Sequence, residues 1–202
     1  MTKHDMTLMY AMHDALRREL EHLAKLAARK DGDPRQILAD APGWELFKKA
    51  LHAHHTAEDD ALWPVMRETL AGRPDDLALL DAMEAEHARI DPVIEAMDTG
   101  VEPLGDLVGT LTSGLTVHLK HEEDDAIPLM HEVVTPEQMA AFGQAHAAQV
   151  GPDGPRIIPW LLEGADAATT ATTLAVLPEP VRALYEAEWR PAYAALNRWN
   201  TA

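Results

Sequence analysis

The 202-residue sequence contains no cysteine, and this absence excludes several kinds of functional site. Disulfide bonds, thiolate zinc sites, iron–sulfur clusters and thiol catalysis all depend on that side chain. Runs of β-branched residues are almost absent too, whereas helix-forming residues dominate the whole sequence. The composition therefore favours an all-α fold whose chemistry relies on nitrogen and oxygen donors.

Long apolar runs and an excess of positive charge are also missing. No stretch approaches the roughly 20 apolar residues of a membrane-spanning helix. The first residues carry scattered charges without the apolar core of a signal peptide, so we expect a cytoplasmic protein. The sequence has 17 Lys+Arg against 34 Asp+Glu, a net charge of −17, which argues against a nucleic-acid partner and against binding to an acidic membrane.

The spacing of apolar residues along the sequence is that of amphipathic helices. Apolar residues recur at steps of three and four, which gives each predicted helix one buried stripe. Glycine- or proline-containing turns separate four such helices, predicted at about 5–30, 43–71, 75–98 and 103–132. Helices with short connections form an antiparallel up-down four-helix bundle, which we predict for residues 1–133. Pro64, Pro92 and Pro128 fall inside these helices and should kink or locally break them.

The remaining residues, 134–202, are predicted to form a helical appendage. A fifth helix is expected at 135–149 with Thr135 as its N-cap, and a last helix from about 178 to 199. Aromatic residues are concentrated in this segment, at Trp160, Trp189, Tyr193 and Trp199. Such residues indicate packing against another surface, either the bundle itself or a second copy of the chain in a homodimer.

Each buried stripe of the bundle is interrupted by polar residues at positions where an apolar residue is expected. The four helices contribute four histidines and two glutamates in this way: His13; His54 and Glu58; His87; His118 and Glu122. A single core histidine is usually only hydrogen-bonded. Six interruptions on four helices would each carry a desolvation cost, so a common cause is a better explanation.

The six side chains should also meet at one level of the bundle. Glu58 and His87 each lie about 12 residues, or roughly 20 Å of helix, from the turn that joins their helices. His118 lies a similar distance beyond the next turn. An up-down arrangement therefore places all six side chains in one layer.

An internal repeat strengthens this interpretation. The pattern His54-x3-Glu58-x5-Pro64 recurs 64 residues later as His118-x3-Glu122-x5-Pro128. A spacing of four residues places both side chains on one helix face, so the histidine can bind one metal ion while the carboxylate reaches a second. Imidazole combined with carboxylate suits iron, zinc or manganese.

These residues resemble the hemerythrin-like family, the HHE cation-binding domain, in its bacterial H…HxxxE…H…HxxxE form. The resemblance covers about residues 5–132 and includes the two downstream prolines. It implies a non-haem centre of two iron ions joined by an oxo or hydroxo bridge. It further implies that O2, H2O2 or nitric oxide is the ligand.

The third helix departs from the oxygen-carrying members of the family. Those members have a second histidine there, as HxxxH, whereas Met83 and Asp91 flank His87 in this sequence. Two six-coordinate irons offer about twelve positions, and the predicted donors with one bridging oxygen fill about ten. The open positions favour an enzyme that decomposes peroxide, of the catalase or peroxidase kind. The alternatives are a reversible carrier or sensor of O2 or nitric oxide, and an interaction module with a structural metal.

Several other side chains near the predicted centre are assigned weaker roles. Tyr10 and His121, each about one turn from a predicted ligand, are candidate proton donors or extra ligands. The helical phase places His55 and His52 about 100° and 160° away from the His54 face, so neither is predicted to bind metal. The same prediction holds for the remaining histidines, His4, His22, His131 and His146. The acidic runs after each glutamate form a solvated rim or, alternatively, supply a carboxylate that orients a ligand histidine.

Overall fold

The computed structural model describes residues 4–199, and within that range the chain forms helices and no strand. The predicted all-α class is therefore confirmed. Contacts divide the chain into two compact units: His4 with residues 51–149 form unit 1, and residues 5–50 with 150–199 form unit 2. The predicted domain boundary after residue 133 stays a prediction. None of the described helices is long and apolar enough to cross a membrane.

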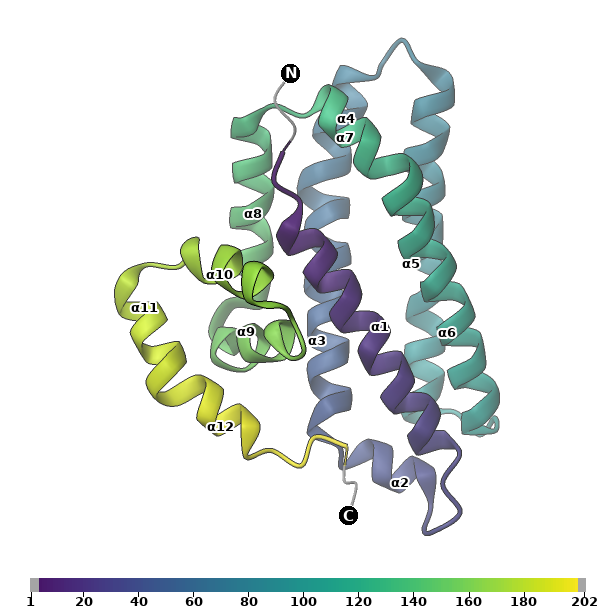
Figure 1. Cartoon of the computed structure of the whole chain (residues 1–202). Coiled ribbons are helices and arrows are strands. Elements are labelled where there is room, and N and C mark those ends of the chain that lie inside the picture. Colours follow the sequence, from purple (N-terminus) through teal and green to yellow (C-terminus); the bar gives the residue numbers. More distant parts are fainter. Residues whose placement is uncertain (1–3, 200–202) are drawn as a thin grey trace. The chain divides into compact units, whose positions relative to one another are not determined.

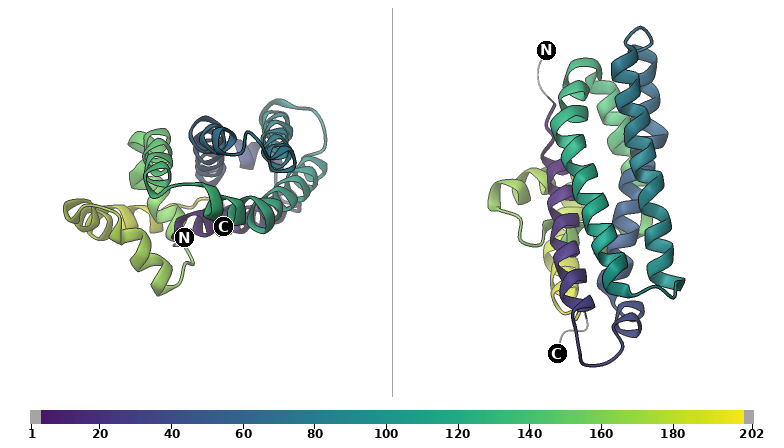
Figure 2. Two further views of the ribbon diagram at one scale, coloured as in Figure 1. Left: turned by 90° about the horizontal axis from the view of Figure 1, so that it is seen from above. Right: turned by 90° about the vertical axis from the view of Figure 1, so that its right-hand side faces the viewer.

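Unit 1 contains most of the predicted bundle. Its elements are the end of α3 (Pro42–Ala57), the π-helical segment η1 (Glu58–Leu62), α4 (Trp63–Thr69), α5 (Pro74–Thr99), α6 (Leu104–His121), a second π-helical segment η2 (Glu122–Ala126), α7 (Ile127–Val133) and α8 (Pro136–Val150). Short turns join α4 to α5 and α5 to α6, so these neighbours run antiparallel. Helices α5 and α6 lie side by side along their length (Figures 1 and 2).

The core of unit 1 follows the predicted stripes. Its side chains lie at steps of three and four along each helix and are at most 3% exposed; they include Leu62, Met66, Leu80, Met83, Ile90, Leu111 and Leu115. Burial of apolar surface contributes about 25 cal/mol per Å², and this term fixes how each helix is rotated about its axis. The polar residues that interrupt the stripes are consequently turned toward the same interior.

The two prolines of the internal repeat have the same structural effect. In η1 the N–H of Trp63 donates to the carbonyl of Glu58, and in η2 the N–H of Ile127 donates to that of Glu122, five residues back in each case. Proline follows directly and has no N–H to continue the α-helical pattern. Each glutamate therefore begins a widened turn, a feature that is frequent at functional sites. Pro92, by contrast, lies inside α5 without ending it.

Unit 2 combines the N-terminal helix with the end of the chain. It contains α1 (Thr7–Ala27), α2 (Pro34–Ala39), the start of α3, the 3-10 segment η3 (Gly151–Asp153), α9 (Gly154–Leu162), α10 (Ala167–Ala175), α11 (Glu179–Leu184), the π-helical segment η4 (Tyr185–Trp189) and α12 (Arg190–Ala194). Both α9 and α10 pack on α1. Trp160, Tyr193 and Trp199 are buried, and Trp189 is half-buried. The packing surface that these aromatic residues were expected to have is therefore provided in part by α1, within unit 2.

A buried ion-pair network joins α1 to the last described residues. Glu19 is fully buried and accepts hydrogen bonds from Arg18 Nε at 2.8 Å, Arg198 Nη1 at 3.3 Å and Trp199 Nε1 at 2.8 Å. Glu163 pairs with both arginines. Every charge in this network has a partner of opposite sign, which is the condition for burying a carboxylate at tolerable cost.

The start of α8 confirms another prediction from the sequence. The Thr135 hydroxyl accepts a hydrogen bond from the N–H of Gln138 at 3.2 Å. The Gln138 side chain in turn accepts from the N–H of Thr135 at 2.8 Å. This reciprocal pair is a capping box, so Thr135 is the N-cap of the helix that follows the bundle.

Candidate metal centre

All six residues that interrupt the predicted stripes are buried. Their exposed fractions are at most 3%: His13 0%, His54 2%, Glu58 0%, His87 3%, His118 0% and Glu122 0%. His13 lies on α1 in unit 2, and the other five lie in unit 1. The burial expected from the stripes is thus observed at each position, and the role of these residues as ligands stays a prediction.

The carboxylate of Glu58 is buried at a high cost in free energy. Both of its oxygens are buried without a hydrogen bond. The nearest nitrogens are His54 Nδ1, 3.3 Å from Oε1, and His87 Nε2, 3.5 Å from Oε2. Burial raises the pKa of Glu58 well above its ordinary value, and the nearby carboxylate of Glu122 raises this pKa further. Among the described residues, no lysine or arginine forms an ion pair with Glu58.

Two histidines are held by carboxylates on their outer side. His87 Nδ1 lies 2.8 Å from Asp59 Oδ1, and His118 Nδ1 lies 3.0 Å from Glu86 Oε2. Because a carboxylate only accepts, each Nδ1 carries the proton, and each Nε2 then presents a lone pair. Carboxylates hold metal-binding histidines in this way, fixing both the tautomer and the ring orientation.

The two free edges of these rings face each other. The Nε2 atoms of His87 and His118 lie 3.1 Å apart. Two lone pairs at this distance repel unless a proton or a metal ion lies between them. Burial, with a smaller contribution from His87, lowers the pKa of His118 to about 4, so that ring is neutral near pH 7. A neutral imidazole is the form that binds a metal ion.

Glu86 was not singled out in the sequence, although it occupies a central position. Its Oε2 accepts from His118, and its Oε1 lies 3.0 Å from Nδ1 of His121, whose side chain is 31% exposed. Burial alone would raise the pKa of Glu86, but hydrogen bonds from His121 and His118 outweigh burial and lower it. Its position directly before His87 in the sequence is the signal that could have identified it.

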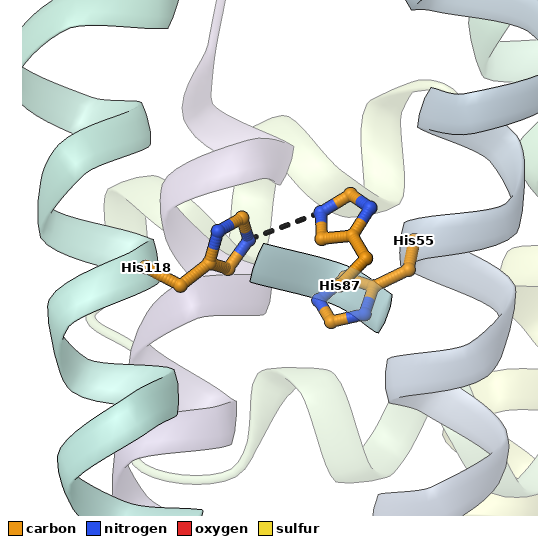
Figure 3. Close-up of side chains that lie close together, drawn as sticks. All are labelled: His55, His87 and His118. Atoms are coloured by element: carbon orange, nitrogen blue, oxygen red, sulfur yellow. Dashed lines mark hydrogen bonds between the residues drawn. The ribbon is translucent and has the colours of Figure 1, made fainter. Parts of the chain in front are cut away.

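The structure differs from the sequence prediction at His55. This residue is 5% exposed, and its ring stacks on His87 with centroids 3.9 Å apart and an angle of 9° between the planes. One ring nitrogen from each of His55, His87 and His118 lies within 4.8 Å of the others. Figure 3 shows the three rings, which come from α3, α5 and α6, lying close together, with the ring of His118 facing that of His87.

The reason lies in the width of the buried face of α3. Leu51, His54, His55, Glu58 and Leu62 follow steps of three and four, and all are at most 5% exposed. The buried face of a helix spans at least about 100°, so two adjacent residues can lie on either side of its midline. The predicted position of His55 outside this face was therefore wrong, whereas His52, on the opposite side, is exposed as predicted.

The other histidines and Tyr10 have surroundings of their own. Tyr10 on α1 is 43% exposed, and its proposed role as proton donor or ligand stays a prediction. His146 on α8 lies edge-on to His54 at 6.4 Å between centroids, and burial lowers its pKa. His22 stacks on Trp199 and His4 stacks on His131, so these three histidines have structural contacts.

The donor set in unit 1 fits a metal ion. It combines a buried carboxylate without a hydrogen bond, a second buried carboxylate beside it and imidazole nitrogens whose lone pairs converge. A cation would satisfy all of these groups together. Asp59, which could have been part of a solvated rim, instead orients His87, as in the alternative derived from the sequence.

The comparisons with known proteins agree with this geometry. A family model described as the hemerythrin HHE cation binding domain matches residues 4–130, well over half of the chain. Helices α8 to α12 lie outside the matched range. Searches of curated proteins and of solved structures gave no match.

Proposed function

Because the chain belongs to the hemerythrin HHE cation-binding family, we propose that it holds a pair of iron ions and uses them to bind or react with O2, peroxide or nitric oxide. The observation that carries the proposal is the buried carboxylate of Glu58, which lies beside Glu122 and pairs with no lysine or arginine among the described residues. The residues that would hold the ions are the six predicted from the sequence, His13, His54, Glu58, His87, His118 and Glu122.

The protein contributes orientation and charge to this centre. Asp59 and Glu86 hold the rings of His87 and His118 so that Nε2 of each faces inward. The two glutamates would offset part of the charge of the ions, and the surrounding apolar layer excludes water. When bound, iron supplies a redox-active centre with coordination positions for a small ligand.

Peroxide decomposition is the reaction that we propose first. The argument is the small number of histidines predicted to bind, which leaves about two of the twelve positions of an iron pair for outside ligands. His121, half-exposed and hydrogen-bonded to Glu86, is the proposed proton carrier between solvent and the centre. A second candidate function, reversible binding of O2 or nitric oxide, is favoured by the burial of His55 beside His87.

Metal analysis combined with an optical spectrum tests the proposal. We expect about two irons per chain, and a spectrum that changes when peroxide or O2 is added. Consumption of peroxide beyond one equivalent supports the enzyme, whereas a stable and reversible O2 adduct without turnover supports the carrier. A folded protein that contains no iron and takes none up would overturn the iron-pair proposal. Zinc alone calls for reloading with iron, because overexpressed sites can bind the wrong metal.

Histidine variants test the proposed ligand set. We expect His54→Ala and His118→Ala each to lose at least one metal ion, because both rings lie in the buried layer. His22→Ala and His131→Ala are the controls, since these rings stack elsewhere in the structure. Measurement of metal content by elemental analysis distinguishes the two groups. Equal losses from all four variants would show that the assigned ligands are wrong.

A further inference from the structure

We propose that unit 2 contains a ligand site of its own, a pocket that binds a free amino acid with an aromatic side chain. The pocket has a volume of about 410 Å³, which is within the range of small-molecule sites in proteins. Its walls come from the start of α9, the π-helical segment η4, α12 and a residue just after α12. These elements contact one another within unit 2 and lie outside the range that the family model matches, so the site does not depend on the proposed iron pair.

Two groups of opposite charge line the pocket without pairing. Arg156 on α9 is half-buried, and Glu188 in η4 is exposed. Neither forms an ion pair with the other or with any further described residue, although the sequence has 34 acidic residues for its 17 basic ones. Arg18 and Arg190, also in unit 2, each pair with a carboxylate. A ligand that carries both a carboxylate and an ammonium group would supply a partner for each of the two charges.

The remaining walls of the pocket are apolar or aromatic. Trp189, Ala192, Tyr193 and Leu196 line it together with the two charged groups. The ring of Trp189 is half-buried and stacks on no other aromatic ring among the described residues. An aromatic side chain in the pocket would bury these surfaces and gain stacked or edge-to-face contacts with the two rings. An amino acid with such a side chain therefore fits both the charges and the walls.

The wall formed by Tyr193 is fixed before any ligand binds. Its side chain is buried, its hydroxyl donates to Glu163 Oε2 at 2.9 Å, and the guanidinium carbon of Arg198 lies 5.0 Å from the centroid of its ring. Glu163 and Arg198 also belong to the buried ion-pair network around Glu19. A wall that does not have to be ordered on binding lowers the cost of association.

A widened helical turn brings two of the lining residues to the pocket. In η4 the N–H of Arg190 donates to the carbonyl of Tyr185, five residues back, and Pro191 follows directly. Turns of this kind are frequent at functional sites. The other two π-helical turns of the described chain begin at glutamates of the proposed metal centre, whereas η4 contributes nothing to that centre. Placing Glu188 and Trp189 against a ligand gives η4 a corresponding role.

Three ligands that differ in one charged group test the site on the whole native chain. L-tryptophan has both groups, tryptamine lacks the carboxylate, and indole-3-propionate lacks the ammonium group. For tryptophan we expect a dissociation constant of about 1 mM or lower, which ordinary affinity per atom gives for a ligand of this size. Tryptamine should bind at least about tenfold more weakly, because the charged hydrogen bonds to Arg156 are lost. Indole-3-propionate should bind up to about fivefold more weakly, because water screens the exposed Glu188. Isothermal titration calorimetry measures all three.

Substitutions assign each charge of the ligand to its residue. In Arg156→Gln, tryptophan and tryptamine should bind equally, and in Glu188→Gln, tryptophan and indole-3-propionate should bind equally. Arg190→Gln is the control, since this arginine follows Trp189 directly but pairs with Glu186, and its affinity for tryptophan should be unchanged. Ala192→Trp replaces an exposed alanine by a ring that fills the pocket, and it should abolish binding without a change in helix content.

Several outcomes would overturn the proposed site. No heat of binding from tryptophan at about ten times the expected dissociation constant is one, because most sites would then be occupied. Equal binding of the three ligands is another, as is an equal loss of affinity in Arg156→Gln and Arg190→Gln. Sedimentation detects a second copy of the chain on the apolar walls, and a dimer that excludes tryptophan would also overturn the site. The ligand series uses the native protein alone, so it decides the question even if a variant fails to fold.

Discussion

Two fully buried carboxylates, Glu19 in unit 2 and Glu58 in unit 1, have opposite surroundings. Glu19 accepts hydrogen bonds from Arg18, Arg198 and Trp199, whereas neither oxygen of Glu58 accepts one. Burying a carboxylate costs several kcal/mol unless a partner compensates for the lost hydration. Unit 2 supplies the compensating charge from its own side chains. Among the described residues of unit 1, no lysine or arginine pairs with Glu58, so its carboxyl keeps a proton in the metal-free chain, as its raised pKa indicates, and a bound cation would compensate for its charge in the loaded chain.

The comparison shows two roles of buried glutamates. In unit 2, Glu19 on α1 binds Arg198 and Trp199 near the end of the chain, and its role is to stabilise the folded structure. In unit 1 a glutamate is kept at a cost to the metal-free protein, because the site that it forms needs a negative charge. Substitutions of the two residues should therefore have effects of opposite sign on stability.

The largest expected effect is at Glu19. Glu19→Gln takes from Arg18 and Arg198 one of the two carboxylates that they share, and breaking such a buried pair costs about 3–5 kcal/mol of unfolding free energy. The lower end applies here because Glu163 still pairs with both arginines. Denaturation by urea measures the loss. Glu21→Gln is the control, since that carboxylate is 76% exposed and pairs weakly with Lys25; an equal loss there would contradict the assignment.

Metal loading should stabilise the chain through the Glu58 region and independently of Glu19. Iron at about 100 times its dissociation constant adds about 2.7 kcal/mol to the unfolding free energy. We expect this gain in the native protein and in Glu19→Gln, measured as a shift in the urea midpoint under anaerobic conditions. The double variant Glu58→Gln, Glu122→Gln should show no gain. A gain that survives in the double variant would place the bound ion elsewhere.

The metal-free protein should become more stable when Glu58 is replaced. Glu58→Gln keeps the shape and removes the ionisable group, so we expect a gain of about 1 kcal/mol or more near pH 7, because each unit by which folding raises the pKa of a carboxyl group costs about 1.4 kcal/mol above that pKa. A destabilised metal-free variant would contradict the comparison.

The pH dependence of the metal-free protein gives an independent check on the same residue. The raised pKa means that the folded chain keeps the Glu58 proton at a pH where the unfolded chain, with its ordinary value of 4.5, has lost it. The native state therefore binds more protons, and its stability falls as pH rises toward the raised pKa. Above the ordinary value of 4.5, the contribution of Glu58 to this fall should be present in the metal-free native protein and absent in Glu58→Gln, so the difference between the two proteins isolates it from the titration of His118.

The smallest effect is expected at an exposed ion pair of unit 1. Arg67 lies 2.6 Å from Asp81, whose side chain is 68% exposed. Asp81→Asn should change the unfolding free energy by about 0.2–1 kcal/mol, because water screens such a pair and Glu84 remains beside Arg67. Urea denaturation at low and high salt measures the change. A loss as large as that of Glu19→Gln would show that burial does not govern these energies.

The sequence predicts the helices and the buried layer well because both follow from the apolar period. The six interruptions of the stripes, from His13 to Glu122, are all buried because the neighbouring apolar residues fix the rotation of each helix. The burial of His55 was not predicted, because a single direction was assigned to the buried face of α3, whereas that face is wide enough to include two adjacent residues. The hydrogen bonds of Glu86 were not predicted, because they depend on where the rings of His118 and His121 lie in the folded structure.

The sequence pattern also did not predict where the helical period changes locally. Pro64 and Pro128 indicate a disturbance, but a kink, a break and a π-helical turn all satisfy the missing N–H. The last predicted helix is likewise interrupted by the π-helical segment Tyr185–Trp189 and ends at Ala194, earlier than its apolar and aromatic residues indicated.

The widened turns at Glu58 and Glu122 set a condition for anyone who wishes to build this centre into a designed bundle. One extra residue in a turn shifts the direction of every following side chain by about 100°. Copying only the histidine and the glutamate into a regular α-helix would therefore leave the downstream core residues, Trp63 and Met66 in the first copy, on the wrong side. A design should therefore copy the whole stretch from His54 to Pro64. The core residues that follow it should be placed with their helical direction shifted by about 100° relative to the core residues before it.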